Sequence, residues 1–400
     1  MPSVVAQERS PAARELYDRL LALPSAPFSS EERASALDRF FSLPSGRERP
    51  GRFWRVDFES LAPEAAAIGT GPQAAQFETR EGGVTVCDLA TAAARWPELL
   101  ARAFGATAAS GTKFGSLTAA FAQSGAFVHV RADHASDEPV VVTYRAPDGG
   151  AIFPWTVLLA ERGSRVTLVE RIEGAGSAFV CGTTEIVTDE NAEVCHAVLQ
   201  RSGDAARVIW NRFTLPGRDA HVCIADAELG GALSAGEIVV SIEAPGSTSE
   251  IAAIFFPGGS QHVDIVSTVD HRAGEATSET LVKSAARERG QARFLGNIRI
   301  APHAQGSDAR LRDDALLLSP TAHVDSVPAL EIGANDVKAY HGATVGAMDA
   351  EQIFYMESRG IERLAAERMI ALGFFEPAIE RFPTVSLRDE IRAALAGKLS

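Results

Sequence analysis

The chain has 400 residues, 46% of them hydrophobic, and carries 52 acidic against 38 basic side chains. Its length and hydrophobic content allow a substantial core and favour two or three domains. The net charge of -14 would repel a phosphate backbone or an anionic membrane surface, so neither nucleic acid nor membrane is an expected partner. Because no apolar run is long enough to span a bilayer and the N-terminus lacks a secretion-type apolar segment, we expect a cytoplasmic protein.

Residues 1–125 are expected to form an N-terminal helical domain. Ser29 and Glu32 have the spacing of a capping box ahead of an apolar repeat. The segments 89–104 and 114–121 also carry apolar residues at helical spacing. Several short helices are therefore predicted before the pattern changes.

From Ala126 the sequence changes to short runs rich in β-branched residues, separated by turn pairs such as Pro245-Gly246. Strand follows strand for about 200 residues without an intervening helical pattern. This excludes an alternating α/β sheet and leaves a sandwich, a pair of barrels or a β-solenoid. So long a run favours the solenoid, with two strands per coil, although no strict sequence repeat is visible. We predict a parallel β-helix core over residues 126–334.

Residues 335–400 return to helical spacing and are predicted to form a C-terminal helical domain. The segments 348–356 and 361–372 carry apolar residues at i, i+3 and i+4. Ser386 and Asp389 have the spacing that caps a last amphipathic helix. Helices at both ends would close the solenoid.

The cysteines do not indicate a metal site by themselves. Four are present and none forms a C-x-x-C pair: Cys87, Cys181, Cys195 and Cys223. This argues against a zinc ribbon or a thioredoxin-like motif, and we expect reduced thiols. His221 and Cys223 would share a strand face, as two metal ligands could, whereas Cys195 and His196 would point to opposite faces. Because two ligands do not define a site, a structural role is favoured for all four residues.

The sequence does not favour either of two enzyme classes. Acidic pairs such as Asp313-Asp314, or Asp264 with Asp270, could act as the carboxylates of a carbohydrate-cleaving β-helix enzyme. Acidic residues on solvated turns are commoner, and neighbours on a strand point to opposite faces. The chain has no G-x-x-x-x-G-K-[ST] motif, so it cannot supply ATP hydrolysis, and it has no readable flavin motif. We expect a non-enzymatic protein.

A set of short motifs follows in one order. They are Leu316-Leu317-Leu318-Ser319, Pro328-x-Leu330-Glu331-Ile332, the predicted turn His341-Gly342-Ala343-Thr344, and Phe354-Tyr355 followed by Ser358-Arg359-Gly360-Ile361. Their order and spacing resemble the C-terminal part of the SufB/SufD family of iron-sulfur cluster assembly scaffolds. Similar stretches at 114–130 and 261–300 extend the resemblance to residues 110–395. It implies a right-handed parallel β-helix flanked by helical domains.

Within this family the chain is more similar to the SufD type than to the SufB type. SufB-type chains are longer and tend to carry a histidine flanked by glutamates, whereas the flanks here are Tyr340 and Gly342. The resemblance implies a non-ATPase scaffold of the SUF complex. A SufB-like scaffold would pair through the β-helix, and a SufC-like ABC-type ATPase would dock on residues 335–400. A homodimer remains open.

His341 is the candidate metal residue, because a neutral imidazole can ligate iron. One imidazole cannot make a closed site, so iron or a nascent iron-sulfur cluster would be held at an interface shared with a partner and not stably by this chain alone. The alternative is a histidine that hydrogen-bonds at a domain junction. The chain would then be a purely structural adaptor in the same complex.

Phe354, Tyr355, Arg359 and Gly360 are the candidate partner-binding residues. On a helix, Phe354 and Tyr355 point about 100° apart, so one could anchor the core while the other reaches a partner. Gly360 is expected to end that helix. The resemblance implies that the ATPase subunit docks here. The alternative is that these residues only seal the end of the solenoid.

Overall fold

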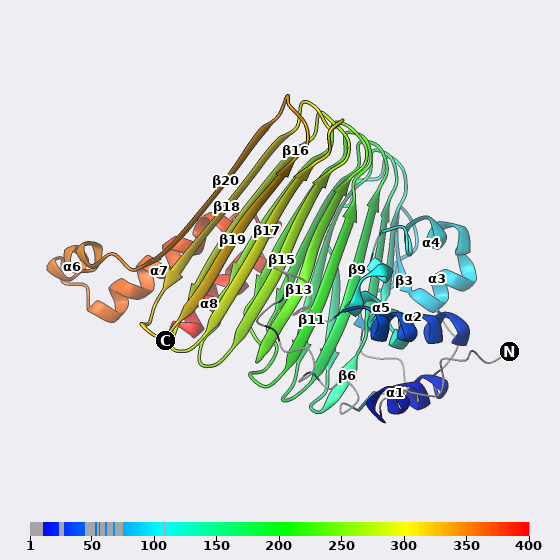
Figure 1. Cartoon of the computed structure of the whole chain (residues 1–400), viewed down its shortest axis with the longest axis horizontal. Coiled ribbons are helices and arrows are strands. Elements are labelled where there is room, and N and C mark those ends of the chain that lie inside the picture. Colours follow the sequence, from blue (N-terminus) through cyan, green and yellow to red (C-terminus); the bar gives the residue numbers. More distant parts are fainter. Residues whose placement is uncertain are drawn as a thin grey trace.

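The computed structural model describes residues 11–23, 28–44, 53, 56, 61, 67–68, 75–107 and 109–399. Over these residues the protein is mainly β, with helices at both ends (Figure 1). The strands form a parallel β-solenoid of about eight turns, which confirms the predicted fold class. No helix in the described ranges is both long enough and apolar enough to cross a membrane.

Each full coil contributes one strand to each of two facing sheets. The eleven-stranded sheet contains β1 (Ala67–Ile68), β3 (Val84–Asp88), β4 (Ala126–Val130), β6 (Gly150–Ile152), β7 (Trp155–Ala160), β9 (Phe179–Thr188), β11 (Arg207–Leu215), β13 (Leu233–Ile242), β15 (His262–His271), β17 (Gln291–Ile300) and β19 (His323–Ile332). The nine-stranded sheet contains β2 (Ala75–Gln76), β5 (Val140–Ala146), β8 (Arg165–Gly174), β10 (Glu193–Gln200), β12 (His221–Glu228), β14 (Thr248–Phe255), β16 (Thr277–Ala286), β18 (Asp308–Leu317) and β20 (Lys338–Ala347). From β4 onward the pairing along the solenoid is parallel.

The coils differ in length, which explains why no sequence repeat is visible. Arg207 pairs with Leu233, 26 positions later, whereas Gln291 pairs with His323, 32 positions later. Because the strands stay in register while the turns vary, only the alternation of inward and outward side chains recurs from coil to coil.

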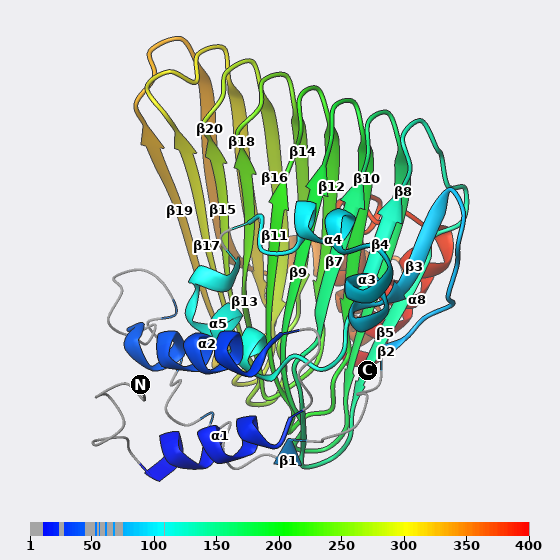
Figure 2. The ribbon, with the colours of Figure 1, turned by 90° about the vertical axis from the view of Figure 1, so that its right-hand side faces the viewer.

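The N-terminal helices pack on the outer face of the eleven-stranded sheet (Figure 2). They are α1 (Pro11–Leu21), α2 (Ser30–Ser42), α3 (Leu89–Arg95), α4 (Pro97–Ala103), the 3-10 turn η5 (Ala109–Gly111) and α5 (Lys113–Phe121). The predicted capping box is confirmed: Ser29 accepts from the Glu32 amide and the Glu32 side chain returns to the Ser29 backbone. Arg33 is buried and donates to the carbonyls of Ala120 and Ala122 at 2.9 and 2.6 Å, which joins α2 to the end of α5.

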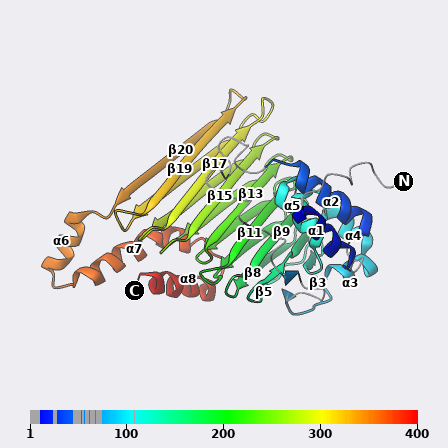
Figure 3. The ribbon, with the colours of Figure 1, turned by 60° about the horizontal axis from the view of Figure 1, so that its bottom comes forward.

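The C-terminal helices are α6 (Ala350–Ser358), α7 (Arg363–Ile379) and α8 (Val385–Lys398). α7 and α8 lie along the outer face of the nine-stranded sheet, while α6 projects away from it (Figures 1 and 3). Outward apolar residues on the sheet, such as Leu199 and Ile254, pack against Phe375 and Ile391. The expectation that these helices close the end of the solenoid is therefore wrong, because the apolar stripe that they cover lies on the side of the solenoid.

Three smaller expectations for this region are also corrected. Thr384, not Ser386, caps α8, and its hydroxyl accepts from the Leu387 amide at 3.2 Å. The solenoid does not end at residue 334, because β20 continues it to Ala347 and helix begins only at Ala350. The predicted turn His341-Gly342-Ala343-Thr344 is part of this strand, because the backbone pairs with β18 along the whole length of β20.

The interior of the solenoid combines an apolar core with buried charges. Arg212 lies 3.1 Å from Asp226 and 2.6 Å from Glu228, and all three side chains are almost fully buried. In the neighbouring coil, His196 lies 2.7 Å from Glu170. Burial raises the pKa of Glu170, but hydrogen bonding and charge from His196 outweigh it and the net pKa is lowered. These charges are tolerable inside because each has a partner.

Candidate functional site

The two ends of the solenoid differ in how their last strands are paired. At the N-terminal end, β3 and β2 pair antiparallel to β4 and β5 and so terminate both sheets. At the other end, β19 and β20 pair only with the preceding coil, and no further strand of the described chain follows them. All residues of β20 except Ala339 are exposed, in contrast to the largely buried β18 beside it. The last coil is therefore an open end.

His341 lies on the inner side of this open end. It pairs in register with Leu311, which is buried in the interior core, and Ala339, two residues earlier, packs against that same core. Because alternate residues of a strand share a face, the His341 imidazole points inward over the uncovered end of the core. No hydrogen bond or ion pair engages this imidazole within the described residues, so both ring nitrogens are free to meet a ligand.

Beside His341 the inner surface contains one acidic group. Asp313, on the neighbouring strand, is almost fully buried and accepts a hydrogen bond from Ser326 of β19. Burial, with a smaller contribution from the adjacent Asp314, raises the pKa of Asp313 to about 7. The open end thus combines a free imidazole with a carboxyl group that changes charge near neutral pH.

Asp313 and Asp314 point to opposite faces, as the strand alternation predicts. On the outer face, Asp314 lies 2.8 Å from both Lys283 and Arg312 and accepts from Thr344 at 2.6 Å. The two carboxyl groups therefore cannot act as a pair on one substrate.

The other carboxylates considered for catalysis are paired as well. Asp264 lies 3.1 Å from Arg293 inside the solenoid, and Asp270 lies 3.0 Å from Arg272 at the surface. Each already serves as the counter-ion of an arginine. This arrangement does not favour the carbohydrate-cleaving alternative.

A shallow groove of about 740 Å³ runs between β20 and α7 on the outer face. It is lined by Glu279, Thr280, Leu281, Lys283, Arg310, Leu311, Arg312, Asp314, Tyr340, His341, Gly342, Ala343, Thr344 and Pro377. Tyr340 is 60% exposed at its edge, with the Arg310 guanidinium 6.0 Å from its ring. The inward residue His341 lines this groove as well as its outward neighbours Tyr340 and Gly342, so the groove extends to the exposed edge of β20.

α6 follows the open strand directly, because only Met348 and Asp349 separate it from β20. Gly360 ends it as predicted: its φ is +85°, its amide donates to Glu357 O at 2.9 Å, and the Ile361 amide donates to Met356 O at 3.2 Å. These paired bonds form a Schellman motif, which requires the left-handed backbone that glycine allows.

Phe354 and Tyr355 both face away from the protein. They are 72% and 59% exposed, so the expectation that one of them anchors the core is wrong. Ile353 is the buried residue of this helix, and the main packing partner of α6 is α7, so most of its other residues remain exposed or half-exposed. Arg359 approaches the Tyr355 ring at 5.2 Å and its hydroxyl at 3.3 Å. The three residues form one exposed aromatic and cationic patch.

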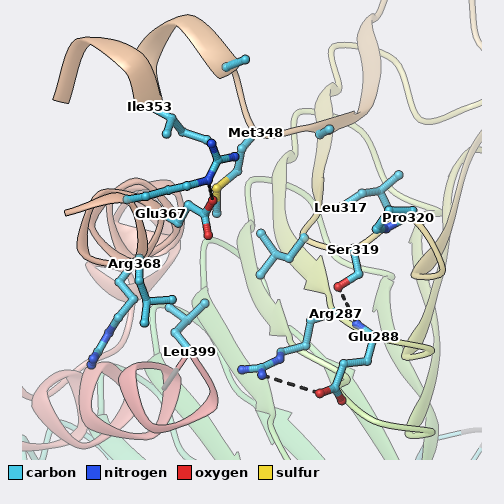
Figure 4. A pocket seen from close by; sticks show the side chains of 15 residues that line it. Arg287, Glu288, Leu317, Ser319, Pro320, Met348, Ile353, Glu367, Arg368 and Leu399 are labelled. Atoms are coloured by element: carbon cyan, nitrogen blue, oxygen red, sulfur yellow. Dashed lines mark hydrogen bonds and ion pairs between the residues drawn. The ribbon is translucent and has the colours of Figure 1, made fainter. Parts of the chain in front are cut away.

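A second cavity, of about 550 Å³, separates α6 and α7 from the last coils (Figure 4). Arg287 and Glu288 line one wall at 3.6 Å from each other, and Arg363 and Glu367 line the opposite wall at 2.9 Å. The sequence did not reveal this cavity, because its walls come from turns and helices far apart along the chain. Arg368, the third arginine of the lining, donates to the Ala396 carbonyl at 3.4 Å. Most of the charges are therefore paired within the lining, so the cavity has the character of a cleft between domains more than of a small-molecule site.

The histidine and cysteine residues of the central coils do not gather into a metal centre. Cys195 and His196 point to opposite faces as expected, with His196 inside and Cys195 outside. His221 lies 3.2 Å from Glu250 at the surface. Across the described part of the chain, no three or more histidine, cysteine, aspartate or glutamate side chains lie close enough to hold a metal ion.

Comparison with known proteins identifies the family. The family model for the SufBD core domain of SUF-system iron-sulfur cluster assembly matches residues 142–374, more than half of the chain. The chain belongs to the SufB/SufD family. The match begins in β5 and ends in α7, so it includes the open end, His341 and α6.

Three relatives are similar to the chain over more than half of its length. The chain is 31% identical over 252 residues to "Protein ABCI7, chloroplastic" of Arabidopsis thaliana, covering 62% of this chain and 53% of that protein. It is 31% identical over 243 residues to SufD of Escherichia coli, covering 60% and 57%. It is 26% identical over 330 residues to SufD of Bacillus subtilis, covering 80% and 75%. The chain thus spans little more than half the length of the first two relatives, and the predicted likeness to SufD is confirmed.

Proposed function

We propose that this chain is a SufD-like, non-ATPase scaffold subunit of iron-sulfur cluster assembly, and that its open coil receives a second scaffold subunit of the SufB type. The observation that carries the proposal is the exposed strand β20, which presents His341 on the inner side of an uncovered core. The cluster, or the iron that enters it, is cargo at this junction. The expected setting is the cytoplasm.

The edge of β20 favours pairing with another strand. Apart from Lys338 at its start, the strand has no charged residue, and it contains no proline. Charges and prolines are the usual protection of exposed edges. The neighbouring inward positions Ile332 and Val345 are 43% and 46% exposed. A partner's coil would cover these apolar side chains and continue the backbone ladder, as in other cases of strand addition.

The proposed role of His341 in holding iron depends on its imidazole having no hydrogen bond or ion pair within the described residues. An imidazole without an internal hydrogen bond gives up only hydrogen bonds to water when it ligates iron, and the low dielectric of a covered core would strengthen that bond. The remaining ligands would have to come from the partner, because the described residues include no cluster of three ligands. Iron would therefore be held only in the assembled pair.

The ATPase subunit would dock on the exposed face of α6 and α7. Phe354, Tyr355, Leu364 and Met369 are all more than half exposed there, which is unusual for large apolar side chains unless a partner covers them. Because two residues connect β20 to α6, a movement of α6 would pull directly on the strand that carries His341. ATP hydrolysis in the partner could thus rearrange the shared site.

Co-purification of this chain from its own cells, followed by mass spectrometry, tests the assembly role. Recovery of a SufB-like scaffold and a SufC-like ATPase is the expected result. Recovery of this chain alone, or only as a homodimer, would count against the proposed complex.

The cargo role is tested separately with His341→Ala, using His323→Ala as its matched control on the outer side of β19, where it pairs with Asp325. We expect His341→Ala to retain its partners but to lose cluster formation, measured by the absorbance of the reconstituted complex, while His323→Ala stays active. If both variants form clusters normally, the chain is a purely structural adaptor and His341 has no metal role.

The docking role is tested with Tyr355→Ala and Arg359→Ala, using Val141→Ala on the distant strand β5 as the control. Tyr355→Ala and Arg359→Ala should weaken binding of the ATPase subunit, and the control should not. Unchanged binding by titration calorimetry would contradict the assignment of α6 as the docking helix.

A further inference from the structure

Cys195 and Cys223 are direct neighbours on adjacent coils. They are register partners in the parallel pair β10 and β12, so both side chains project from the same, outer face of the nine-stranded sheet. Paired strands lie about 4.8 Å apart, which is within the Cα separations that a disulfide bridges (about 4.4–6.8 Å) and slightly beyond its usual Cβ separations (about 3.5–4.5 Å), so a small local shift of the two strands would close the bond. Along the sequence the two residues are separated by a full coil.

The surroundings of this pair differ from those of the other two cysteines. Cys195 and Cys223 are partly exposed, whereas Cys87 and Cys181 are buried. Beside Cys223 lies a cavity of about 10 Å³, lined among others by Glu250, Leu281 and Arg381. This is room for about one water-sized molecule, so a small oxidant can reach the sulfur more readily than a bulky one.

The two thiols also differ in acidity. A hydrogen bond from Cys195, the largest effect, lowers the pKa of Cys223 together with the Arg381 guanidinium, while burial and the nearby Glu250 carboxylate oppose this and raise it. The same hydrogen bond, together with burial, raises the pKa of Cys195. One thiolate hydrogen-bonded by a neighbouring thiol is the usual arrangement of an attacking and a resolving cysteine. Burial raises the pKa of Cys87 to about 11 and that of Cys181 to about 12, which leaves both unreactive.

We propose that Cys195 and Cys223 form a peroxide-reactive dithiol, in which Cys223 attacks and Cys195 resolves to give a reversible disulfide between two coils of the solenoid. This modification site does not depend on the proposed scaffold role. It lies beside the Arg381 ion pairs with Glu250 and Glu279, at 2.6 and 3.1 Å, which fix the end of α7 to the sheet.

The chemistry balances with hydrogen peroxide as the only co-reactant. The Cys223 thiolate attacks one oxygen, the O–O bond breaks, and the released hydroxide takes up the proton that Cys223 had lost, giving a sulfenic acid and water. Cys195 sulfur then attacks Cys223 sulfur, the S–O bond breaks, and hydroxide leaves with the Cys195 proton as a second water. Two thiols are oxidised by two electrons and one peroxide is reduced to two waters.

The test is to treat the full chain with hydrogen peroxide, alkylate the remaining thiols after denaturation, and map the peptides by mass spectrometry. The expected product has lost two hydrogens, carries a Cys195–Cys223 cross-link within one chain, and is restored by dithiothreitol. Cys87 and Cys181 stay alkylatable and serve as internal controls. Alkylation of all four cysteines after treatment would overturn the proposal, as would a cross-link found only between chains.

Two variants identify the attacking sulfur. Cys195→Ser should stop at the Cys223 sulfenic acid, which dimedone traps, whereas Cys223→Ser should consume peroxide at least tenfold more slowly than Cys195→Ser. Equal rates in the two variants would refute the assigned order of attack. If either variant fails to fold, the order is read in the unmutated chain from the first site that dimedone labels. Oxidised glutathione, which is too bulky for the cavity, should react more slowly than peroxide, and faster reaction would contradict the access argument.

Discussion

Replacement of Val345 by arginine should block the pairing of the open coil while leaving the free protein intact. Val345 lies on β20, faces inward in register with Ala315, and is 46% exposed. In the free chain an arginine at this end can extend into solvent, so the free energy of unfolding should change by less than about 0.5 kcal/mol. In the complex the same side chain would be buried against the partner's first coil.

The expected loss of affinity follows from that exposure. Full burial of a valine side chain is worth about 1.5–3 kcal/mol, so covering the exposed 46% is worth about 0.7–1.4 kcal/mol. Val345→Ala should lose at most this amount, a decrease in affinity of up to about 3- to 10-fold. Val345→Arg adds the cost of burying a charge without a partner, at least about 2 kcal/mol, which brings the total decrease to about 100-fold or more.

The assay is titration calorimetry of the purified chain with the SufB-like subunit from the same organism, together with urea unfolding of each free variant. Val141→Arg, an exposed valine at the opposite end of the nine-stranded sheet, is the matched control. If Val345→Arg binds as tightly as the unchanged protein, or if the control is equally weakened, the open coil is not the pairing surface.

Three further predictions concern stability. Burial lowers the pKa of His271 from 6.5 to about 4, so the native state binds fewer protons than the unfolded state between these values. The free energy of unfolding should therefore fall as pH drops from about 6.5 toward 4. Between pH 7 and pH 4.5, urea unfolding should show that His271→Gln loses about 2–3 kcal/mol less of this free energy than the unchanged protein does. Arg212→Ala leaves the buried acidic pair Asp226 and Glu228 without its cation and should cost about 3–5 kcal/mol in urea unfolding, whereas Arg162→Ala, which breaks an exposed pair, should cost less than about 1 kcal/mol. Gly360→Ala places a Cβ at φ +85° and should destabilise the end of α6 by about 1–2 kcal/mol; hydrogen exchange of the Gly360 and Ile361 amides should accelerate while that of the solenoid strands stays unchanged.

Local signals in the sequence predicted local structure well. The Ser29 and Glu32 pair forms the expected capping box, and the long run of strands forms the expected solenoid. Each of these depends on residues close together in the chain, where spacing and side-chain chemistry decide the geometry. The cap of α8 was misassigned because Thr384 and Ser386 are both suitable residues, and only the start of the backbone helix distinguishes them.

Features that depend on register could not be predicted. The neighbouring thiols of Cys195 and Cys223 are brought together by a coil of 28 residues, but other coils range from 26 to 32, so no fixed period relates the two positions. The inward direction of His341 likewise follows from its pairing with Leu311, 30 positions earlier. Alternation along a strand predicts which residues share a face, but only the pairing of that strand with its neighbours determines which face lies inside the solenoid.

The open end illustrates why an interface escapes sequence reasoning. In β20 the inward positions Ala339, His341 and Val345 alternate with outward ones, much as they would in a strand that a further coil covers. The hydrophobic pattern of a strand indicates that one of its faces is buried, but it does not indicate whether the same chain or a partner covers that face. An exposed strand that keeps the pattern of an internal one therefore indicates a missing neighbour, and that is the physical ground for expecting a second scaffold subunit over His341.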